Sequence, residues 1–185
     1  MRIALRLASG LAAAALALMF YPPSLRAAAE TDRKAPSIQL KTLGGKSVRL
    51  ADLRGRIVLI DFWASWCAPC KATFPALNAL GQELKANGVD VLAVSEDEKR
   101  KELDAFLGEH PPTLDVLLDP GGNAAAAFGV TAIPSMFVID RAGVIRFSHA
   151  NYGADVIEAV RAEILTLAGS LTGVNSTTPQ LHNAQ

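Results

Sequence analysis

Cysteine is scarce in this chain of 185 residues, which holds only Cys67 and Cys70. An exported scaffold that depends on disulfides for its stability uses several bridges. A bridge between Cys67 and Cys70 closes a very short loop, so it constrains the unfolded chain little. The scarcity argues against a disulfide-stabilised scaffold and favours a reactive pair of thiols.

An excess of positive charge is also missing. The full chain has 18 Lys and Arg against 18 Asp and Glu, and three arginines (Arg2, Arg6 and Arg26) precede the first acidic residue, Glu30. The chain after residue 29 therefore has 15 basic and 18 acidic residues. Binding to nucleic acid needs a basic patch or stripe. This charge balance provides no such footprint.

The first 29 residues look like an export signal. The segment starts with two positive charges, Arg2 and Arg6, and continues with an uncharged apolar stretch at residues 7–20. Three small residues, Ala27 to Ala29, follow and could be the cleavage site. The alternative is an uncleaved anchor, although two prolines shorten the helix that can form there. Residues 1–29 are therefore predicted to be a signal peptide or an N-terminal membrane anchor. The protein is expected in the periplasm or at the outer face of the cytoplasmic membrane.

Alternating strands and helices are predicted after a short polar linker at residues 30–36. The expected strands are 37–43, 47–50, 57–63, 89–94, 136–139 and 144–148, with a short extended segment at 114–118. The expected helices are one that follows Cys67 and ends near Asn87-Gly88, then 97–109, 123–128, and a last one with its apolar residues between Val156 and Leu167. This order indicates an α/β domain, one mixed sheet with helices on both faces. Residues 169–185 are polar and predict a flexible tail.

The two cysteines lie where the apolar strand 57–63 gives way to a helix. Pro69 fits the first turn of that helix, where a missing N–H costs nothing. A helix N-terminus carries partial positive charge, which favours thiolate over thiol at Cys67 and lowers its pKa. Because the thiolate is the form that attacks disulfides, Cys67 is predicted to be the nucleophile. Cys70, one turn into the helix and more buried, is predicted to resolve the mixed disulfide.

Asp61 interrupts the same apolar strand, six residues before Cys67. A buried carboxylate without a partner is costly to ionise, so the pKa of Asp61 is expected to be raised. The alternative is a solvated or capping aspartate at the end of the strand. The run from Glu96 to Glu98 is interpreted as a solvated helix start, and Trp63 as a core residue.

Two segments resemble thioredoxins. The run Phe62 to Lys71 (FWASWCAPCK) is similar to the thioredoxin active-site segment, and Thr131 to Pro134 (TAIP) resembles the loop that places a cis proline opposite the cysteines. Three further stretches resemble the N-terminal extension of the exported TlpA/ResA-like branch: Ala35-Pro36, Leu43 to Val48, and Leu53 to Gly55. The resemblance covers residues 35–168. It implies a thioredoxin fold, with a central mixed sheet flanked by helices on both faces and an N-terminal β-hairpin extension.

The resemblance also implies a function. It predicts a thiol–disulfide oxidoreductase that reduces disulfides of exported proteins through a redox-active Cys67–Cys70 disulfide, without cofactor or metal. Asp61 stands where thioredoxins use an aspartate to exchange a proton with the resolving thiol. The expected substrate-binding residues are Trp66, Ala68, Pro69, Ile133 and Pro134. Expected partners are exported proteins with disulfides, in cytochrome c maturation or metal-site assembly, and a membrane thiol carrier that re-reduces the pair.

Two positions bear on the finer assignment. Ala68-Pro69 brings no cation to the thiolate, so the expected reduction potential is nearer thioredoxin's roughly −270 mV than DsbA's roughly −120 mV. Thr73 stands where some TlpA/ResA-like reductases carry a glutamate, three residues after the second cysteine. This departure weakens an assignment to cytochrome maturation and leaves the general reductase interpretation unchanged.

Two alternatives remain open at this point. A thiol peroxidase would share the fold and the extension by resemblance, although peroxiredoxin-type domains use a different local cysteine motif. A non-enzymatic module would hold a metal or haem for delivery, with the thiols as ligands. Tetrahedral zinc takes about four ligands, and the histidines stand far from the cysteines in sequence: His110, His149 and His182.

Overall fold

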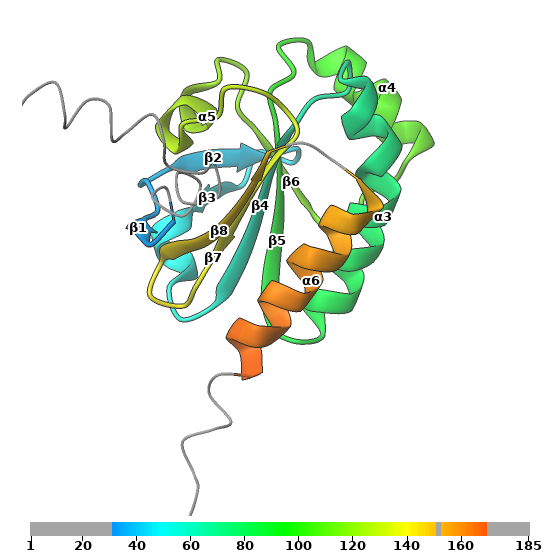
Figure 1. The fold of residues 1–185 in the computed structure, drawn as a ribbon. Helices are drawn as coiled ribbons and strands as arrows, with labels where there is room; N and C mark the ends of the chain where they lie inside the picture. The colour runs from blue at the N-terminus through cyan, green and yellow to red at the C-terminus, as the bar shows by residue number, and fades with distance from the viewer. Residues whose placement is uncertain (1–30, 151–152, 170–185) are drawn as a thin grey trace, which may run out of the picture. The chain divides into compact units, whose positions relative to one another are not determined.

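The computed structural model describes residues 31–150 and 153–169. The chain divides into two units, Met1–Asp32 and Arg33–Gln185, and the architecture below is that of the second. In chain order the second unit contains β1 (Arg33–Lys34), β2 (Gln39–Thr42), β3 (Ser47–Arg49), the 3-10 helix η1 (Leu50–Leu53), β4 (Ile57–Trp63), α3 (Ala68–Lys85), β5 (Val89–Ser95), α4 (Arg100–Glu109), β6 (Asp115–Leu118), α5 (Asn123–Phe128), β7 (Ser135–Ile139), β8 (Val144–Ala150) and α6 (Ala154–Gly169) (Figure 1).

The strands form one mixed sheet in the order β1-β8-β7-β4-β5-β6-β2-β3. β4, β5 and β6 run parallel to one another, whereas β7 pairs antiparallel with β4 and β8 antiparallel with β7. β4 lies at the centre and every one of its residues is buried. A strand that is covered on both faces has a nearly continuous apolar sequence. This is why residues 57–63 were correctly predicted to form a buried strand.

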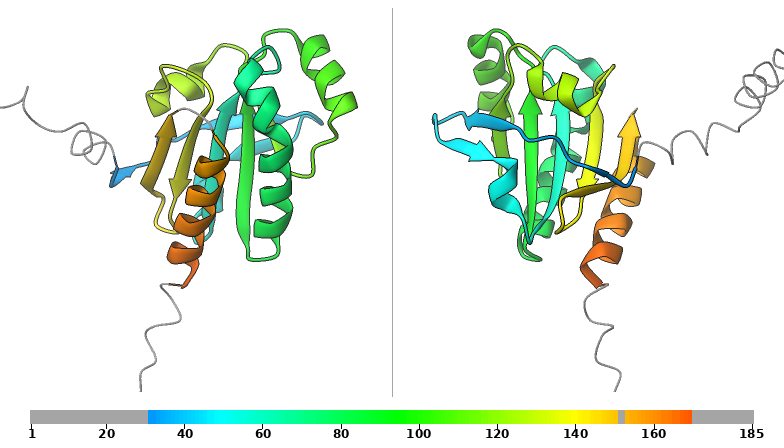
Figure 2. Two further views of the ribbon diagram at one scale, coloured as in Figure 1. Left: turned by 45° about the vertical axis from the view of Figure 1, so that its right-hand side comes forward. Right: turned by 90° about the vertical axis from the view of Figure 1, so that its left-hand side faces the viewer.

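Side chains of β4 alternate between two hydrophobic clusters on the two faces of the sheet. Ile57, Leu59 and Trp63 join the cluster that also holds buried residues of α3, α4 and α6. Val58, Ile60 and Phe62 join the cluster with α5 and Leu50 of η1. Figure 2 shows the first face with α3 and α6 in front, and the second with the N-terminal chain crossing it. The expected α/β fold with helices on both faces is confirmed.

Two expectations about local structure are wrong. Residues 30–36 are not simply a linker, because Arg33–Lys34 form β1 and pair with Val144 and Ile145 of β8. The second helix does not start at residue 97, because α4 begins at Arg100 with Lys99 as its N-cap. The predicted hairpin is confirmed, with β2 and β3 paired antiparallel.

Helix α3 carries the second cysteine and packs on the end of β4. Its buried face is apolar, as the spacing predicted: Cys70, Phe74, Leu77, Leu80, Gly81 and Leu84. The Trp63 ring lies 4.6 Å from the Phe74 ring and 5.5 Å from the Phe106 ring, measured between centroids. With 1% of its surface exposed, Trp63 is a core residue, as expected. This aromatic packing holds the start of α3 against the sheet.

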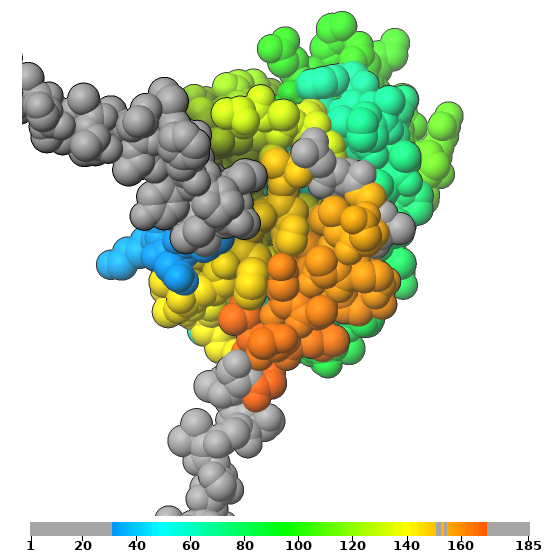
Figure 3. All heavy atoms as spheres, viewed as in Figure 1, coloured from blue at the N-terminus to red at the C-terminus, as the bar shows by residue number. Residues whose placement is uncertain are grey.

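Helix α6 packs beside α3 on the same face of the sheet (Figures 1 and 3). Arg161 of α6 pairs with Glu83 of α3 at 3.1 Å. The predicted signal or anchor at residues 1–29 lies outside the described residues, and so does nearly all of the predicted tail at 169–185. No helix within residues 31–150 and 153–169 combines the length and apolar character that a bilayer crossing needs.

Candidate active site

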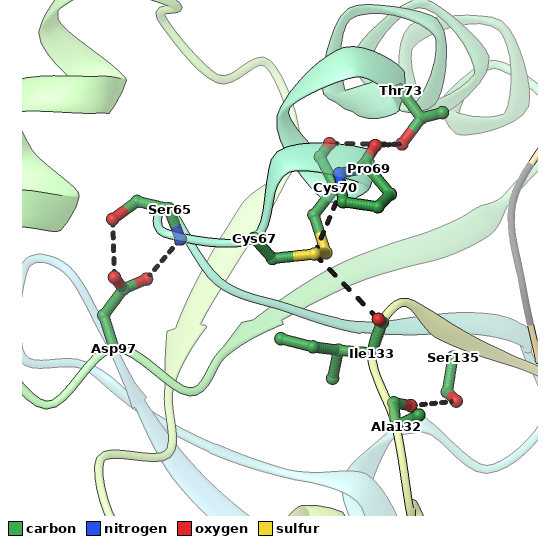
Figure 4. The surroundings of a disulfide bond; sticks show 9 residues. All are labelled: Ser65, Cys67, Pro69, Cys70, Thr73, Asp97, Ala132, Ile133 and Ser135. Carbon is green, nitrogen blue, oxygen red and sulfur yellow. Dashed lines mark hydrogen bonds between the residues drawn. A yellow bond between two sulfur atoms is a disulfide. The ribbon is translucent and has the colours of Figure 1, made fainter.

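A tight turn leads from β4 into α3 and presents the first cysteine. The backbone N–H of Cys67 donates to the Ala64 carbonyl at 3.2 Å, which closes the turn. Cys67 is the N-cap of α3, with extended backbone angles (φ −80°, ψ 108°), and its Sγ accepts the N–H of Cys70 at 3.3 Å. The two cysteines form a disulfide, with their Cα atoms 5.2 Å apart (Figure 4). The sequence therefore places one sulfur at the helix N-terminus, where its thiolate is stabilised.

The disulfide lies just below the surface, surrounded by an exposed rim. Cys67 has 6% of its surface exposed and Cys70 has 3%, so the second cysteine is the more buried, as expected. The residues around them are exposed: Trp66 at 61%, together with Ala68 and Pro69. The rim offers contact surface to another protein, while the sulfurs stay nearly covered.

The loop before β7 lies opposite the disulfide. The Ile133–Pro134 peptide bond is cis, so that expectation is confirmed. The Ile133 carbonyl oxygen lies 3.9 Å from Cys67 Sγ, a contact in which a thiol, but not a disulfide sulfur, can donate a hydrogen bond (Figure 4). The fold thus brings together residues that are 66 positions apart in the chain.

Asp61 is buried on the sheet face that α3 covers. It is 3% exposed and lies on the same side of β4 as Trp63, since side chains two apart on a strand share a face. Its Oδ1 is buried and has no hydrogen-bond partner among the described residues. Burial raises the pKa of the Asp61 carboxyl well above its ordinary value. The expectation of a buried, perturbed carboxyl is confirmed, and the solvated alternative is wrong.

Asp97 is a buried residue that the sequence interpretation missed. It is 5% exposed, and its carboxylate accepts the Ser65 N–H at 2.9 Å and the Ser65 Oγ hydroxyl at 2.5 Å (Figure 4). A third hydrogen bond comes from Ser95 Oγ at 2.8 Å. The interpretation of residues 96–98 as a solvated helix start is therefore wrong at Asp97. Its position directly after an apolar strand was the available signal, since that end of a parallel strand lies beside the cysteine turn.

A pocket of about 440 Å³ opens beside the exposed tryptophan of the rim. Its lining residues are Trp66, Glu96, Glu98, Lys99, Glu102, Pro120, Gly121 and Gly122. The Glu96 backbone N–H donates to the Trp63 carbonyl at 2.9 Å. Burial raises the pKa of Glu96, and the neighbouring Asp119 adds to the effect. The surface next to the disulfide is therefore open, and its acidic side chains outnumber its single lysine.

Thr73 has a local role in α3. Its hydroxyl donates to the Pro69 carbonyl at 2.9 Å and lies 3.1 Å from the Cys70 carbonyl. It supplies no carboxylate three residues after the second cysteine. In residues 31–150 and 153–169, no three His, Cys, Asp or Glu side chains are grouped so that they could hold a metal ion.

Known proteins are similar to this chain in sequence and in fold. The chain is 41% identical over 138 residues to a thiol:disulfide interchange protein DsbE homolog of Paracoccus denitrificans, a match covering 72% of this chain and 74% of the relative. It is 32% identical over 116 residues to the thiol-disulfide oxidoreductase ResA of Bacillus thuringiensis, covering 63% and 67%. A crystal structure of a protein assigned as DsbE from Chlorobium tepidum superposes with a TM-score of 0.71 at 37% identity, covering 75% of this chain and 98% of that one.

The thioredoxin-like sheet, the disulfide at the start of α3 and these relatives define the class of protein. It is a thiol–disulfide oxidoreductase that acts on proteins with disulfides. Residues 31–148 match the AhpC/TSA family, and the chain belongs to that family. The resemblance to ResA-like proteins, expected from the three stretches of the N-terminal extension together with the thioredoxin-like cysteine segment and proline loop, is confirmed.

Proposed function

We propose that this protein reduces disulfides of exported proteins, with Cys67 as the attacking thiolate and Cys70 as the resolving thiol. The observation that carries the proposal is the position of Cys67 Sγ. It caps α3, accepts the Cys70 N–H at 3.3 Å and lies 3.9 Å from the Ile133 carbonyl at an exposed rim. A sulfur that accepts a hydrogen bond from a helix N-terminus is stabilised as an anion.

The exchange balances in two steps. The Cys67 thiolate attacks one sulfur of the substrate disulfide, a mixed disulfide forms, and the other substrate sulfur leaves and takes up a proton. Cys70 then loses its proton and attacks Cys67 Sγ, which releases the second substrate thiol. The enzyme ends as the Cys67–Cys70 disulfide seen here, and the substrate has gained two electrons and two protons.

Asp61 is proposed to take the proton from Cys70 in the second step. Its burial and its raised pKa support this role, because a carboxylate whose pKa is raised is a stronger base toward a thiol. An aspartate with an ordinary pKa would be too weak a base for a thiol.

The substrate is proposed to lie along the exposed rim. Trp66, Ala68 and Pro69 offer exposed surface on one side of the disulfide, and the half-buried Ile133, followed by the buried Pro134, lies on the other. An extended segment of substrate can pair with the backbone at Ile133, as in strand addition. The pocket next to Trp66 leaves room for the flanking chain of the substrate.

Location and direction are part of the same proposal. Export rests on the signal-like residues 1–29, and the reducing direction rests on Ala68-Pro69, which brings no cation to the thiolate. A reductant outside the cytoplasm needs its own supply of electrons, and a membrane thiol carrier is the proposed source. Substrates in cytochrome c maturation or metal-site assembly fit this role, although Thr73 lacks the carboxylate expected of some maturation reductases.

The test uses three forms of the mature protein. We expect the reduced wild type to reduce a model protein disulfide, and Cys67→Ser to be inactive. Cys70→Ser is expected to accumulate a mixed disulfide through Cys67, so partners trapped in the exporting cell can be identified by mass. Alkylation that is equally slow at both thiols at pH 7 would refute the assignment of Cys67. Faster consumption of peroxide than of protein disulfide would favour the peroxidase alternative instead.

A further inference from the structure

The turn that presents Cys67 is held from outside by the end of β5. Asp97 is separated from Ser65 by 32 positions in the chain, yet its two carboxylate oxygens accept both the N–H and the hydroxyl of Ser65. The neighbouring Glu96 N–H donates to the carbonyl of Trp63, two residues before Ser65. The chain from the end of β4 to the turn before α3 is therefore hydrogen-bonded to the residues after β5 at two points, Trp63 and Ser65.

Ser65 is the residue through which this fastening reaches the cysteine. It follows Ala64, the first residue of the turn that the Cys67 N–H closes at 3.2 Å. Trp66, the residue between Ser65 and Cys67, is 61% exposed and adds little buried surface to hold the turn. The position of Cys67 at the N-cap therefore depends strongly on how firmly Ser65 is held.

The Asp97 carboxylate is well suited to hold it. Burying a carboxylate is costly unless hydrogen bonds replace its lost hydration. Here three donors meet it at 2.5 to 2.9 Å, the third being Ser95 Oγ. Hydrogen bonds to an ionised acceptor are roughly twice as strong as neutral ones. These hydrogen bonds connect Asp97 firmly to Ser65, in the short turn before Cys67.

We propose that Asp97 is a positioning residue for thiol–disulfide exchange, which acts through Ser65 to keep Cys67 at the N-cap of α3. The inference rests on the proposed role of Cys67 as nucleophile. When the turn is held, Cys67 Sγ stays within reach of the Cys70 N–H and the helix N-terminus. When it is released, the thiolate loses that fixed stabilisation and the Cys67 thiol holds its proton more tightly.

Two substitutions at Asp97 separate the geometry of the connection from its charge. In Asp97→Asn the amide keeps the shape, its oxygen can accept from Ser65 N–H and Ser95 Oγ, and its NH2 can donate to the Ser65 hydroxyl. Asp97→Ala removes every acceptor. Both remove the negative charge, and the ionisable Asp61, Lys71 and Glu96 are unchanged in both. A difference between the two variants therefore reports on the hydrogen bonds.

The readout is the rate of Cys67 alkylation against pH in the reduced protein. In Asp97→Ala we expect the rate at pH 7 to fall by about tenfold, the equivalent of about one pKa unit. Asp97→Asn is expected to stay within about threefold of the wild type, or about half a unit. Ser65→Ala, which loses only the hydroxyl contact, is expected to fall between them.

Asp119→Ala is the matched control. Asp119 is also buried, at 3% exposed, and its Oδ2 accepts the N–H groups of Ala124 and Ala125 at the start of α5. Its loss removes a comparable buried carboxylate without touching the cysteine turn. We expect this variant to be less stable than the wild type, with an unchanged Cys67 pKa.

The outcomes distinguish a failure of the Asp97 positioning role from a failure of the proposed function. A folded Asp97→Ala with the wild-type pH profile would overturn the positioning role, and so would an equal shift in Asp97→Ala and Asp97→Asn, since that reports charge alone. If Asp97→Ala does not fold, Ser65→Ala with wild-type reactivity overturns the role. A wild-type Cys67 without enhanced reactivity would instead refute the proposed function itself.

Discussion

β4 buries one aspartate, Asp61, and the segment after β5 buries another, Asp97, and the two differ in their hydrogen-bond partners. Asp61 on β4 is 3% exposed, with an unpartnered Oδ1 and a strongly raised pKa. Asp97 after β5 is 5% exposed and accepts three hydrogen bonds. Equal burial therefore does not mean an equal role. Lack of partners favours a group that exchanges its proton, and a full set of donors favours a group that holds structure.

Replacing the Asp61 carboxyl, whose Oδ1 has no partner among the described residues, should affect catalysis most. In Asp61→Asn we expect turnover of a protein disulfide to fall by about 10²-fold, the usual scale for a lost proton-transfer group. The fold should persist, because the amide has nearly the same shape. Steady-state reduction assays across pH 5–9 check this, with circular dichroism as the control for folding. A rate equal to that of the wild type at every pH would remove Asp61 from the mechanism.

Replacing the partnered carboxylate should affect stability most. Asp97→Ala leaves the Ser65 N–H and two hydroxyls without their acceptor, so we expect a loss of about 2–4 kcal/mol in the free energy of unfolding. Asp61→Asn should lose far less. Urea unfolding of both variants measures the contrast. Equal losses would show that the two aspartates do not differ in structural role.

The raised pKa of Asp61 predicts a pH dependence of stability. Its folded-state pKa lies above its unfolded value of about 3.9, so the folded state binds the proton more tightly. The contribution of Asp61 is therefore most favourable below that unfolded value, and it is lost as pH rises toward the folded pKa. The wild type minus Asp61→Asn difference in unfolding free energy should decline over this window. A difference that is flat with pH would contradict the raised pKa.

The smallest effect is expected from one donor of the Asp97 set. Ser95→Ala removes the hydroxyl that donates to Asp97 Oδ2 at 2.8 Å and accepts the Asp97 N–H at 3.1 Å, and it leaves both Ser65 contacts in place. We expect about 1 kcal/mol of lost stability and a Cys67 alkylation rate close to that of the wild type. Urea unfolding and alkylation at pH 7 measure the two effects. A large loss of Cys67 reactivity would mean that the connection depends on all three donors together.

The sequence predicted correctly those elements that depend on residues close together in the chain. The strand 57–63 and the helix after Cys67 follow from apolar runs and spacing, and the cysteine pair and the cis proline follow from short motifs. The exposed Asp61 alternative was wrong because β4 is covered on both faces.

The parts that the sequence missed depend on distant partners. Arg33–Lys34 form a strand because they meet β8, more than a hundred residues away in the chain. Asp97 was predicted to start a helix, but its side chain accepts hydrogen bonds from Ser65, which lies 32 residues earlier in the chain. A pattern read over a short stretch of sequence cannot show such a contact. Propensity describes what a segment prefers alone, and both segments are determined by contacts made on folding.

The burial of the two cysteines affects which thiols can reduce the disulfide. With 6% of Cys67 and 3% of Cys70 exposed, a small dissolved thiol meets little sulfur in a random collision. Exchange rates depend on access to the attacked sulfur as well as on thiol chemistry. A protein that docks on the Trp66 rim can bring its own thiolate to Cys67 and overcome that barrier. We therefore expect small dissolved thiols to reduce the disulfide slowly, and a docked protein thiol to reduce it faster.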